Sequence, residues 1–184
     1  MHALHKILVY IPEVVSNPEN YTREELIKEI RNYAVMNTEQ FYFSVFDYRE
    51  TETAGRWQSR YPLNVLFAKD NKTRFLQELS TTKDSQHERI LDNLSHLKEM
   101  VGTDLVEIIL EIEKLKTFSD HTEKIDSMAE YYLYQIAALL SGNYMFYSGF
   151  YNLDENRARI YEGDLEDVEN STNDWALVMF DYHI

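Results

Sequence analysis

The chain contains no cysteine, only five glycines and three prolines, and far fewer basic than acidic residues. Without cysteine it cannot form a disulfide framework, a thiolate metal site or a cysteine nucleophile. So few glycines argue against phosphate-cradling loops, and neither GxxxxGK[ST] nor GxGxxG occurs. No apolar run reaches the roughly 18 residues of a membrane span, and the opening MHALHKILVYIPE is too briefly apolar for a signal peptide. We therefore expect a soluble intracellular protein.

The charge that is present is mostly negative. Lys+Arg total 18 against 32 Asp+Glu, which gives a net charge of −14. Broad binding to nucleic acid needs clustered Lys and Arg, so this composition argues against it and favours a partner that is itself basic. The 184 residues are 44% hydrophobic and 14% aromatic. That is enough for a folded core, and the length suits one domain over 1–184.

Strand patterns occupy the two ends of the chain. Thr22 and Glu25 form a capping box that predicts a helix after the first strand. Runs of β-branched and aromatic residues predict strands at 7–11, 41–48, 65–68, 144–151, 158–162 and 175–184.

The middle third predicts helices. Ser85 with Glu88 forms a second capping box, apolar residues recur at helical spacing over 105–115, and a third helix begins at Asp120 and stops at Gly142. We therefore expect an α+β fold, with an antiparallel or mixed sheet formed by the N- and C-terminal strands and a helical insertion at about 84–141.

Half of the net charge lies near the C-terminus. Residues 151–184 contain nine acids and two arginines, a net charge of −7. One interpretation is a solvated loop between two strands. The other is an acidic patch that occupies a basic groove, because arrayed carboxylates imitate phosphates. The candidate contact residues are Glu162, Asp164, Glu166, Asp167 and Glu169.

Gly55, Arg56 and Trp57 form the most distinctive short segment. Gly55 permits a tight turn, Arg56 offers a planar fork of donors, and Trp57 offers a large flat face. Arg56 and Trp57 could therefore serve as an interaction hot spot. The alternative is that Trp57 fills the core while Arg56 neutralises one of the many acids.

The sequence gives little support to catalysis. The six histidines form no HExxH or HxH pattern, so we expect no metal site and no cofactor. Asp181 and His183 are the one acid–histidine pair within a predicted buried strand, where a spacing of two places them on one face. They could serve a small metal-dependent hydrolase or nuclease, or hold the end of a strand. A binding protein is favoured over an enzyme.

Two motifs resemble those of a group of small proteins from bacteriophages and mobile elements. Phe46-Asp47-Tyr48 leading to Gly55-Arg56-Trp57 is similar to that group's Tyr followed by Gly-Gly-Arg-Trp, with Ala54 in place of the first Gly. The ending Asp181-Tyr182-His183-Ile184 is similar to the group's Asp-x-His-Ile. Because that group carries no agreed activity, the resemblance implies a genetic setting rather than a reaction.

Small size, acidity and a phage-like setting are together similar in character to type II anti-CRISPR inhibitors. This likeness implies a partner with a basic nucleic-acid groove, such as a type II RNA-guided nuclease or its guide complex in the host bacterial cytoplasm. The inhibitor would interfere with guide RNA or DNA engagement through the acids of 162–169, with Arg56 and Trp57 as further contacts. A phage accessory or structural domain that dimerises through its helices is a third possibility.

Overall fold

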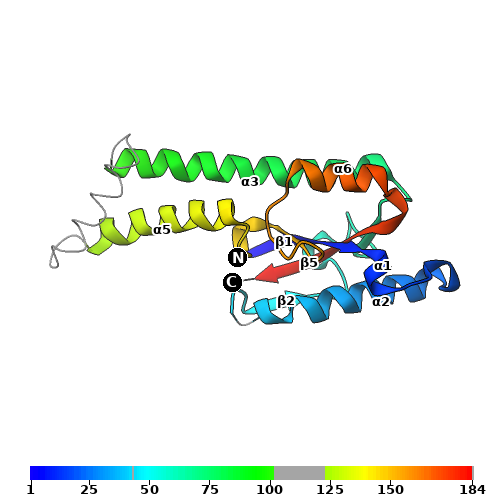
Figure 1. The fold of residues 1–184 in the computed structure, drawn as a ribbon. Helices are drawn as coiled ribbons and strands as arrows, with labels where there is room; N and C mark the ends of the chain where they lie inside the picture. The colour runs from blue at the N-terminus through cyan, green and yellow to red at the C-terminus, as the bar shows by residue number, and fades with distance from the viewer. Residues whose placement is uncertain (43, 102–122, 184) are drawn as a thin grey trace. The chain divides into compact units, whose positions relative to one another are not determined.

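A computed structural model describes residues 1–42, 44–101 and 123–183 of the chain (Figure 1). The chain divides into two compact units, one formed by Met1–Lys83 with Gly142–Ile184 and the other by Asp84–Ser141. The second unit covers the stretch expected as a helical insertion. The expectation that the whole chain forms a single domain stays a prediction.

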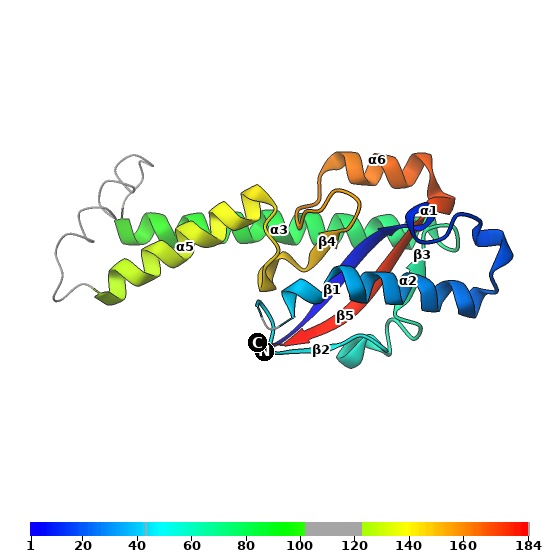
Figure 2. The same ribbon diagram turned by 60° about the horizontal axis from the view of Figure 1, so that its bottom comes forward.

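The first unit is built on a five-stranded mixed sheet. β1 and β5 pair in antiparallel fashion along their whole length, from His2↔His183 to Tyr10↔Trp175, and β4 runs parallel to β1. The N and C ends of the chain therefore lie side by side (Figure 2). This arrangement confirms the predicted α+β class and the sheet formed by the N- and C-terminal strands. The strands are β1 (His2–Tyr10), β2 (Tyr48–Glu50), β3 (Val65–Phe67), β4 (Phe150–Asn152) and β5 (Trp175–His183).

Two short strands share one edge of β5. β2 pairs with residues 181–183 and β3 with residues 176–178 of that strand. Between them the chain leaves the sheet and returns at Asn64, whose carbonyl accepts a hydrogen bond from the Met179 amide at 2.8 Å. The segment 51–64 is therefore held beside the middle of β5.

Helices cover both faces of this sheet. They are α1 (Ile11–Val14), α2 (Arg23–Asn37), α6 (Glu162–Asn170) and the part of α3 (Lys72–Val101) that ends at Lys83. Alternate residues of β1 face opposite sides, because successive side chains of a strand point in opposite directions. Ile7 and Val9 pack in a cluster with Ile30 of α2, whereas Leu8 packs with Phe75 of α3 and Val168 of α6. α2 and α6 therefore lie on opposite faces of the sheet (Figures 1 and 2).

Local capping signals explain where some of these helices begin. The Thr22 hydroxyl oxygen accepts from the Glu25 amide at 3.3 Å, and a Glu25 carboxylate oxygen accepts from the Thr22 amide at 2.9 Å. This is the predicted capping box of α2. α3 begins at Lys72 rather than at the predicted Ser85, since the Asn71 side chain accepts from the Arg74 amide at 2.9 Å and caps the helix.

The second unit contains the rest of α3 and α5 (Glu123–Ser141). Leu97, Ala129 and Ile136 form its buried cluster. Gly142 follows α5 with φ of +74°, which agrees with the predicted stop. The helix expected over 105–115 and the start expected at Asp120 lie outside the described residues.

Three predicted strands are wrong in whole or in part. Residues 41–48 contain the end of a 3-10 turn and only the first residue of β2, while β4 takes up only the end of 144–151. The segment 158–162 runs into α6 instead of forming a strand. In each case the aromatic or apolar residues are drawn into the core, as Phe46, Phe146 and Ile160 are. Burial can therefore be achieved without strand pairing.

None of the helices over 1–42, 44–101 and 123–183 combines the length and the apolar character needed to cross a bilayer.

His5 lies fully buried on β1 among aromatic rings. Its Nδ1 lies 3.0 Å from the Tyr144 hydroxyl, and the rings of Phe46 and Tyr182 each have centroids 4.9 Å from its own. Burial lowers the pKa of His5 from 6.5 to about 3, because the imidazolium form would lose its hydration. The side chain is therefore neutral in the folded protein at pH 7.

Acidification is expected to destabilise the protein through His5. Between pH 6.5 and 3 the unfolded chain binds a proton that the folded chain does not, so the free energy of unfolding falls as pH falls. The slope attributable to His5 reaches about 1.4 kcal/mol per pH unit. Urea unfolding of the protein and of His5→Phe at several pH values measures it. The slope should diminish in His5→Phe and persist in the control His87→Gln, whose side chain is exposed; equal slopes in all three proteins would contradict the assignment.

Candidate functional site

The acidic segment forms a helix rather than the loop expected between two strands. α6 spans Glu162–Asn170, and Asp164 lies at its third position, where its carboxylate accepts a hydrogen bond from the Tyr161 amide at 2.7 Å. Such a cap satisfies a free N–H at the start of the helix. The exposed members of the predicted set are Glu162, Glu166, Asp167 and Glu169.

Asp164 has a different position from the other four acids. It is only 3% exposed, and its carboxylate receives two hydrogen bonds from the Arg157 guanidinium, at 2.9 and 2.7 Å. The Asn152 side-chain Nδ2 donates to the same carboxylate at 2.8 Å. A bidentate pair of this kind fixes geometry as well as charge. Asp164 is therefore a positioning residue in this structure, since its carboxylate is buried and engaged by Arg157, Asn152 and Tyr161 rather than presented on the surface.

The network around Asp164 also holds a neighbouring loop. The Asn152 side-chain oxygen accepts from the amides of Asp154 at 3.1 Å and Glu155 at 3.3 Å, and both of these acids are exposed. Asn152 thus links this loop to the first turn of α6. We call the exposed carboxylates of both segments the acidic surface: Asp154, Glu155, Glu162, Glu166, Asp167 and Glu169.

Two lysines lie at the border of the acidic surface. The Lys83 ammonium pairs with the Glu162 carboxylate. The Lys72 ammonium donates to the backbone carbonyl of Glu169 at 3.1 Å. Asp154 and Glu155 belong to the acidic stretch of the sequence but were not among the predicted site residues, since their link to the first turn of α6 through Asn152 is visible only in the fold.

Arg56 and Trp57 lie at a different edge of the sheet. They form a 3-10 turn with Gly55 in the segment between β2 and β3, on the side of β5 opposite to β1 and β4. Arg56 is exposed, whereas Trp57 is half-buried and packs against the cluster that contains Phe75 and Leu177. Packing in the core therefore explains the burial of much of the Trp57 side chain. The turn also lies across the sheet from the Asn152–Asp164 hydrogen bond at the β4 edge.

Asp181 and His183 do not form a pair with one another. Asp181 is 2% exposed, and its two oxygens engage His2 Nδ1 at 2.9 Å and the Arg56 amide at 3.1 Å. His183 Nδ1 instead lies 2.9 Å from an oxygen of Asp47. Throughout the described part of the chain, no three His, Asp or Glu residues are grouped so that they could hold a metal ion. The geometry thus gives no support to a hydrolase built on Asp181 and His183.

Gly55 leaves the space that Asp181 occupies. Its φ is +51°, a conformation that residues with a Cβ rarely adopt. A Cβ at this position would lie 2.3 Å from Asp181 Oδ2. Glycine is therefore required here both for the turn and for the close approach of the carboxylate.

A second buried charge network joins β1 to α3 within the first unit. The Lys6 ammonium lies 2.9 Å from one Glu78 carboxylate oxygen and donates to Thr82 Oγ1 at 2.7 Å, while Arg60 lies 2.6 Å from the other Glu78 oxygen. Burial lowers the pKa of Lys6. Burial alone would raise the pKa of Glu78, but the hydrogen bonds and charges of its basic neighbours hold it below its usual value. Because each charge is partnered, loss of any one of these side chains would leave a buried charge without compensation.

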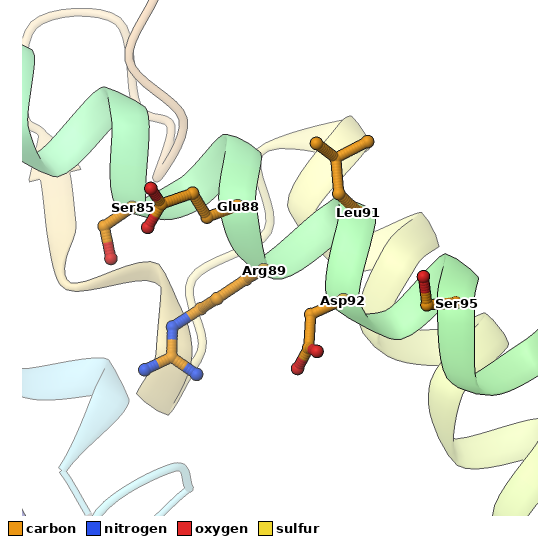
Figure 3. A pocket seen from close by; sticks show the side chains of 6 residues that line it. All are labelled: Ser85, Glu88, Arg89, Leu91, Asp92 and Ser95. Atoms are coloured by element: carbon orange, nitrogen blue, oxygen red, sulfur yellow. The ribbon is translucent and has the colours of Figure 1, made fainter.

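A shallow hollow runs along α3 in the second unit, and Figure 3 shows its lining. The six lining residues all come from this one helix and mix acidic, basic, polar and apolar groups: Ser85, Glu88, Arg89, Leu91, Asp92 and Ser95. A ligand needs contacts from several directions to be held and oriented. We therefore assign no site to this hollow.

Substitution of Gly55 by Ala should destabilise the protein by about 2–3 kcal/mol, since the new Cβ must displace the Asp181 carboxylate in a strained backbone conformation. Urea unfolding measures the change. Gly163→Ala is the matched control, because no atom lies within 4 Å of an added Cβ in this helical position. It should stabilise by up to about 1 kcal/mol. Equal effects of the two substitutions would contradict the assigned role of Gly55.

Substitution of Asp164 by Asn should cost about 3 kcal/mol, because it leaves the Arg157 guanidinium without its carboxylate. The same change at exposed Asp167 should leave the unfolding midpoint unchanged. Denaturant titration of both variants compares the two positions. A loss of stability in Asp167→Asn as large as that in Asp164→Asn would contradict the distinction between a buried anchor and a surface acid.

Comparisons of the chain with protein-family models, with curated proteins and with solved structures find no match, so the acidic surface is interpreted from its own geometry.

Proposed function

We propose that the chain is an anti-defence protein of a phage or mobile element. It binds a type II RNA-guided nuclease in the host bacterial cytoplasm through the acidic surface, and it interferes with the engagement of guide RNA or DNA. The observation that supports this function is the acidic surface itself. Its carboxylates are exposed, and the buried Asp164–Arg157–Asn152 network links the two backbone segments that carry them.

The placement of these acids is unfavourable for the isolated helix. Glu162, Glu166 and Glu169 share one side of α6, where like charges three or four residues apart repel. Glu166, Asp167 and Glu169 also lie toward the C-terminal end, where the helix dipole disfavours negative charge, and the last turn contains no basic residue. Within the fold Lys83 pairs with Glu162, while the side chains of Glu166, Asp167 and Glu169 remain exposed. Contact with a basic partner would offset the repulsion among these exposed acids.

The chemistry of the partner follows from that of the surface. Carboxylates on a rigid helix form charge-assisted hydrogen bonds with Lys and Arg, and these bonds resemble those that the same cations make to phosphate. The channels that hold guide RNA and DNA in RNA-guided nucleases are positively charged. A protein of net charge −14 is repelled by the nucleic acid and attracted to the empty channel. The proposed action is occupancy of that channel, and it requires no cofactor and no catalysis by this chain.

The proposal is tested by reversing part of the acidic surface. In the test variant Glu166, Asp167 and Glu169 become Lys, which also suits the C-terminal end of α6. We expect the wild-type protein to inhibit guided DNA cleavage by a member of a panel of purified type II nucleases, and the variant to require at least about tenfold more protein for the same inhibition. Inhibition should also weaken as the salt concentration rises from about 50 to about 300 mM, because salt screens interactions between exposed charges.

A control variant carries the same change in net charge on the opposite face of the sheet. Glu19, Glu24 and Glu29 are exposed residues on and before α2, and reversing all three to Lys leaves the acidic surface intact. This control should inhibit like the wild type. An equal loss of inhibition in both variants would show that net charge, and not the acidic surface, is responsible, and would contradict the proposal. Absence of inhibition and of binding across the nuclease panel would overturn the proposed function.

A further inference from the structure

Two histidines meet at the open end of the β1–β5 ladder. His2 and His183 are direct partners in the antiparallel register, so their side chains lie on the same face. Their ring centroids are 4.7 Å apart, with an angle of 49° between the ring planes. The His2 side chain is 23% exposed and the His183 side chain 35% exposed, so solvent reaches both rings.

Each imidazole is oriented by a carboxylate of its own. His2 Nδ1 lies 2.9 Å from Asp181 Oδ1, and His183 Nδ1 lies 2.9 Å from Asp47 Oδ1. A carboxylate can only accept a hydrogen bond, so each Nδ1 must carry the proton. In a neutral imidazole the other nitrogen, Nε2, then holds a free lone pair. Two such lone pairs are therefore presented by adjacent rings.

We infer that His2 and His183 form a binding site for a divalent transition-metal ion such as Zn²⁺. Imidazole nitrogen is a preferred ligand of zinc, nickel and copper. Histidines that bind these metals commonly donate their second ring nitrogen to a carboxylate, which fixes the tautomer and strengthens the ligand. Here that arrangement occurs twice, with Asp181 and Asp47 as the orienting carboxylates and Nε2 of each ring as the metal ligand.

The separation of the rings is compatible with one shared ion. Two nitrogens bound to a tetrahedral zinc at about 2.0–2.1 Å lie roughly 3.3 Å apart. A centroid separation of 4.7 Å permits that spacing when the two Nε2 atoms face a common point. Water completes the coordination sphere, since the described residues supply no third ligand close to the pair.

Asp181, one of the two orienting carboxylates, is fixed by several contacts within the fold. Asp181 is buried, accepts from the Arg56 amide at 3.1 Å, and occupies the space left open by Gly55. This assigns Asp181 an orienting role behind His2 rather than the ligand or base role considered from the sequence. A bound ion would join the first and last strands of the sheet and stabilise their pairing by mass action.

Isothermal titration of EDTA-treated protein, prepared without a polyhistidine tag, with ZnCl₂ tests the site. We expect saturable binding of Zn²⁺ at a ratio of one ion per chain and a rise in the thermal unfolding midpoint with zinc concentration. His183→Ala should abolish both effects. Asp47→Asn keeps both rings but loses the orienting carboxylate, and it should weaken binding by about 10–100-fold.

The controls separate this site from other histidines and from misfolding. His87→Ala and His96→Ala change histidines of the second unit and should bind zinc like the wild type. Metal-free unfolding midpoints of His183→Ala and Asp47→Asn show whether each variant is folded. Failure of the wild type to bind zinc would overturn the site, as would unchanged binding in folded His183→Ala. Neither result bears on the acidic surface, which shares no residue with the histidine pair.

Discussion

The antiparallel pairing of the first and last strands is the constraint on which the rest of the structure depends. β1 and β5 lie far apart in sequence, so their pairing closes a loop of nearly the whole chain at a considerable entropic cost. The buried residues on both faces of the ladder offset that cost, since Ile7 and Val178 face one side while Leu8 and Leu177 face the other. Every other strand of the sheet attaches to one of these two.

Buried carboxylates act as positioning groups at three places around this ladder. Glu78 holds Lys6 and Arg60, Asp164 holds Arg157, and Asp181 holds His2 and the Arg56 amide. In each case the partners compensate for the hydration that the carboxylate loses on burial. Asp164 and Asp181 also connect the core to exposed groups, the acidic surface in one case and the histidine pair in the other. Acids that look alike in sequence thus divide into anchors and surface charges.

The two proposed sites use opposite properties of the chain. The acidic surface relies on an excess of negative charge, although Glu162 is paired with Lys83. That charge is concentrated where it costs local helix stability, and its interactions are screened by salt. The histidine pair relies on directed lone pairs whose tautomers are set by neighbouring carboxylates. They lie on elements at different parts of the sheet, α6 beside β4 and the His2–His183 rung at the open ends of β1 and β5. Occupancy of one is therefore not required for the other.

Much of the fold could be predicted from local patterns. The capping box at Thr22, the stop at Gly142, the strands at the two ends and the α+β class all follow from short-range chemistry that the residues carry with them. The aromatic run at 41–48 did not predict its structure, because Phe46 is buried against His5 and Tyr182 without extending in a strand. The helix at 162–170 was missed, because its acidic residues were taken for a solvated loop.

The sequence by itself determined the charge, the absence of thiol chemistry and the presence of a strand at each end of the chain. Only the tertiary structure decided which acids are buried anchors, that Asn152 links the loop of Asp154 and Glu155 to α6, and that His2 pairs with His183 while Asp181 bonds to His2. The physical reason is that burial and pairing are properties of contacts between distant residues. The Asp181 carboxylate, for example, meets His2 only when the β1–β5 ladder has formed.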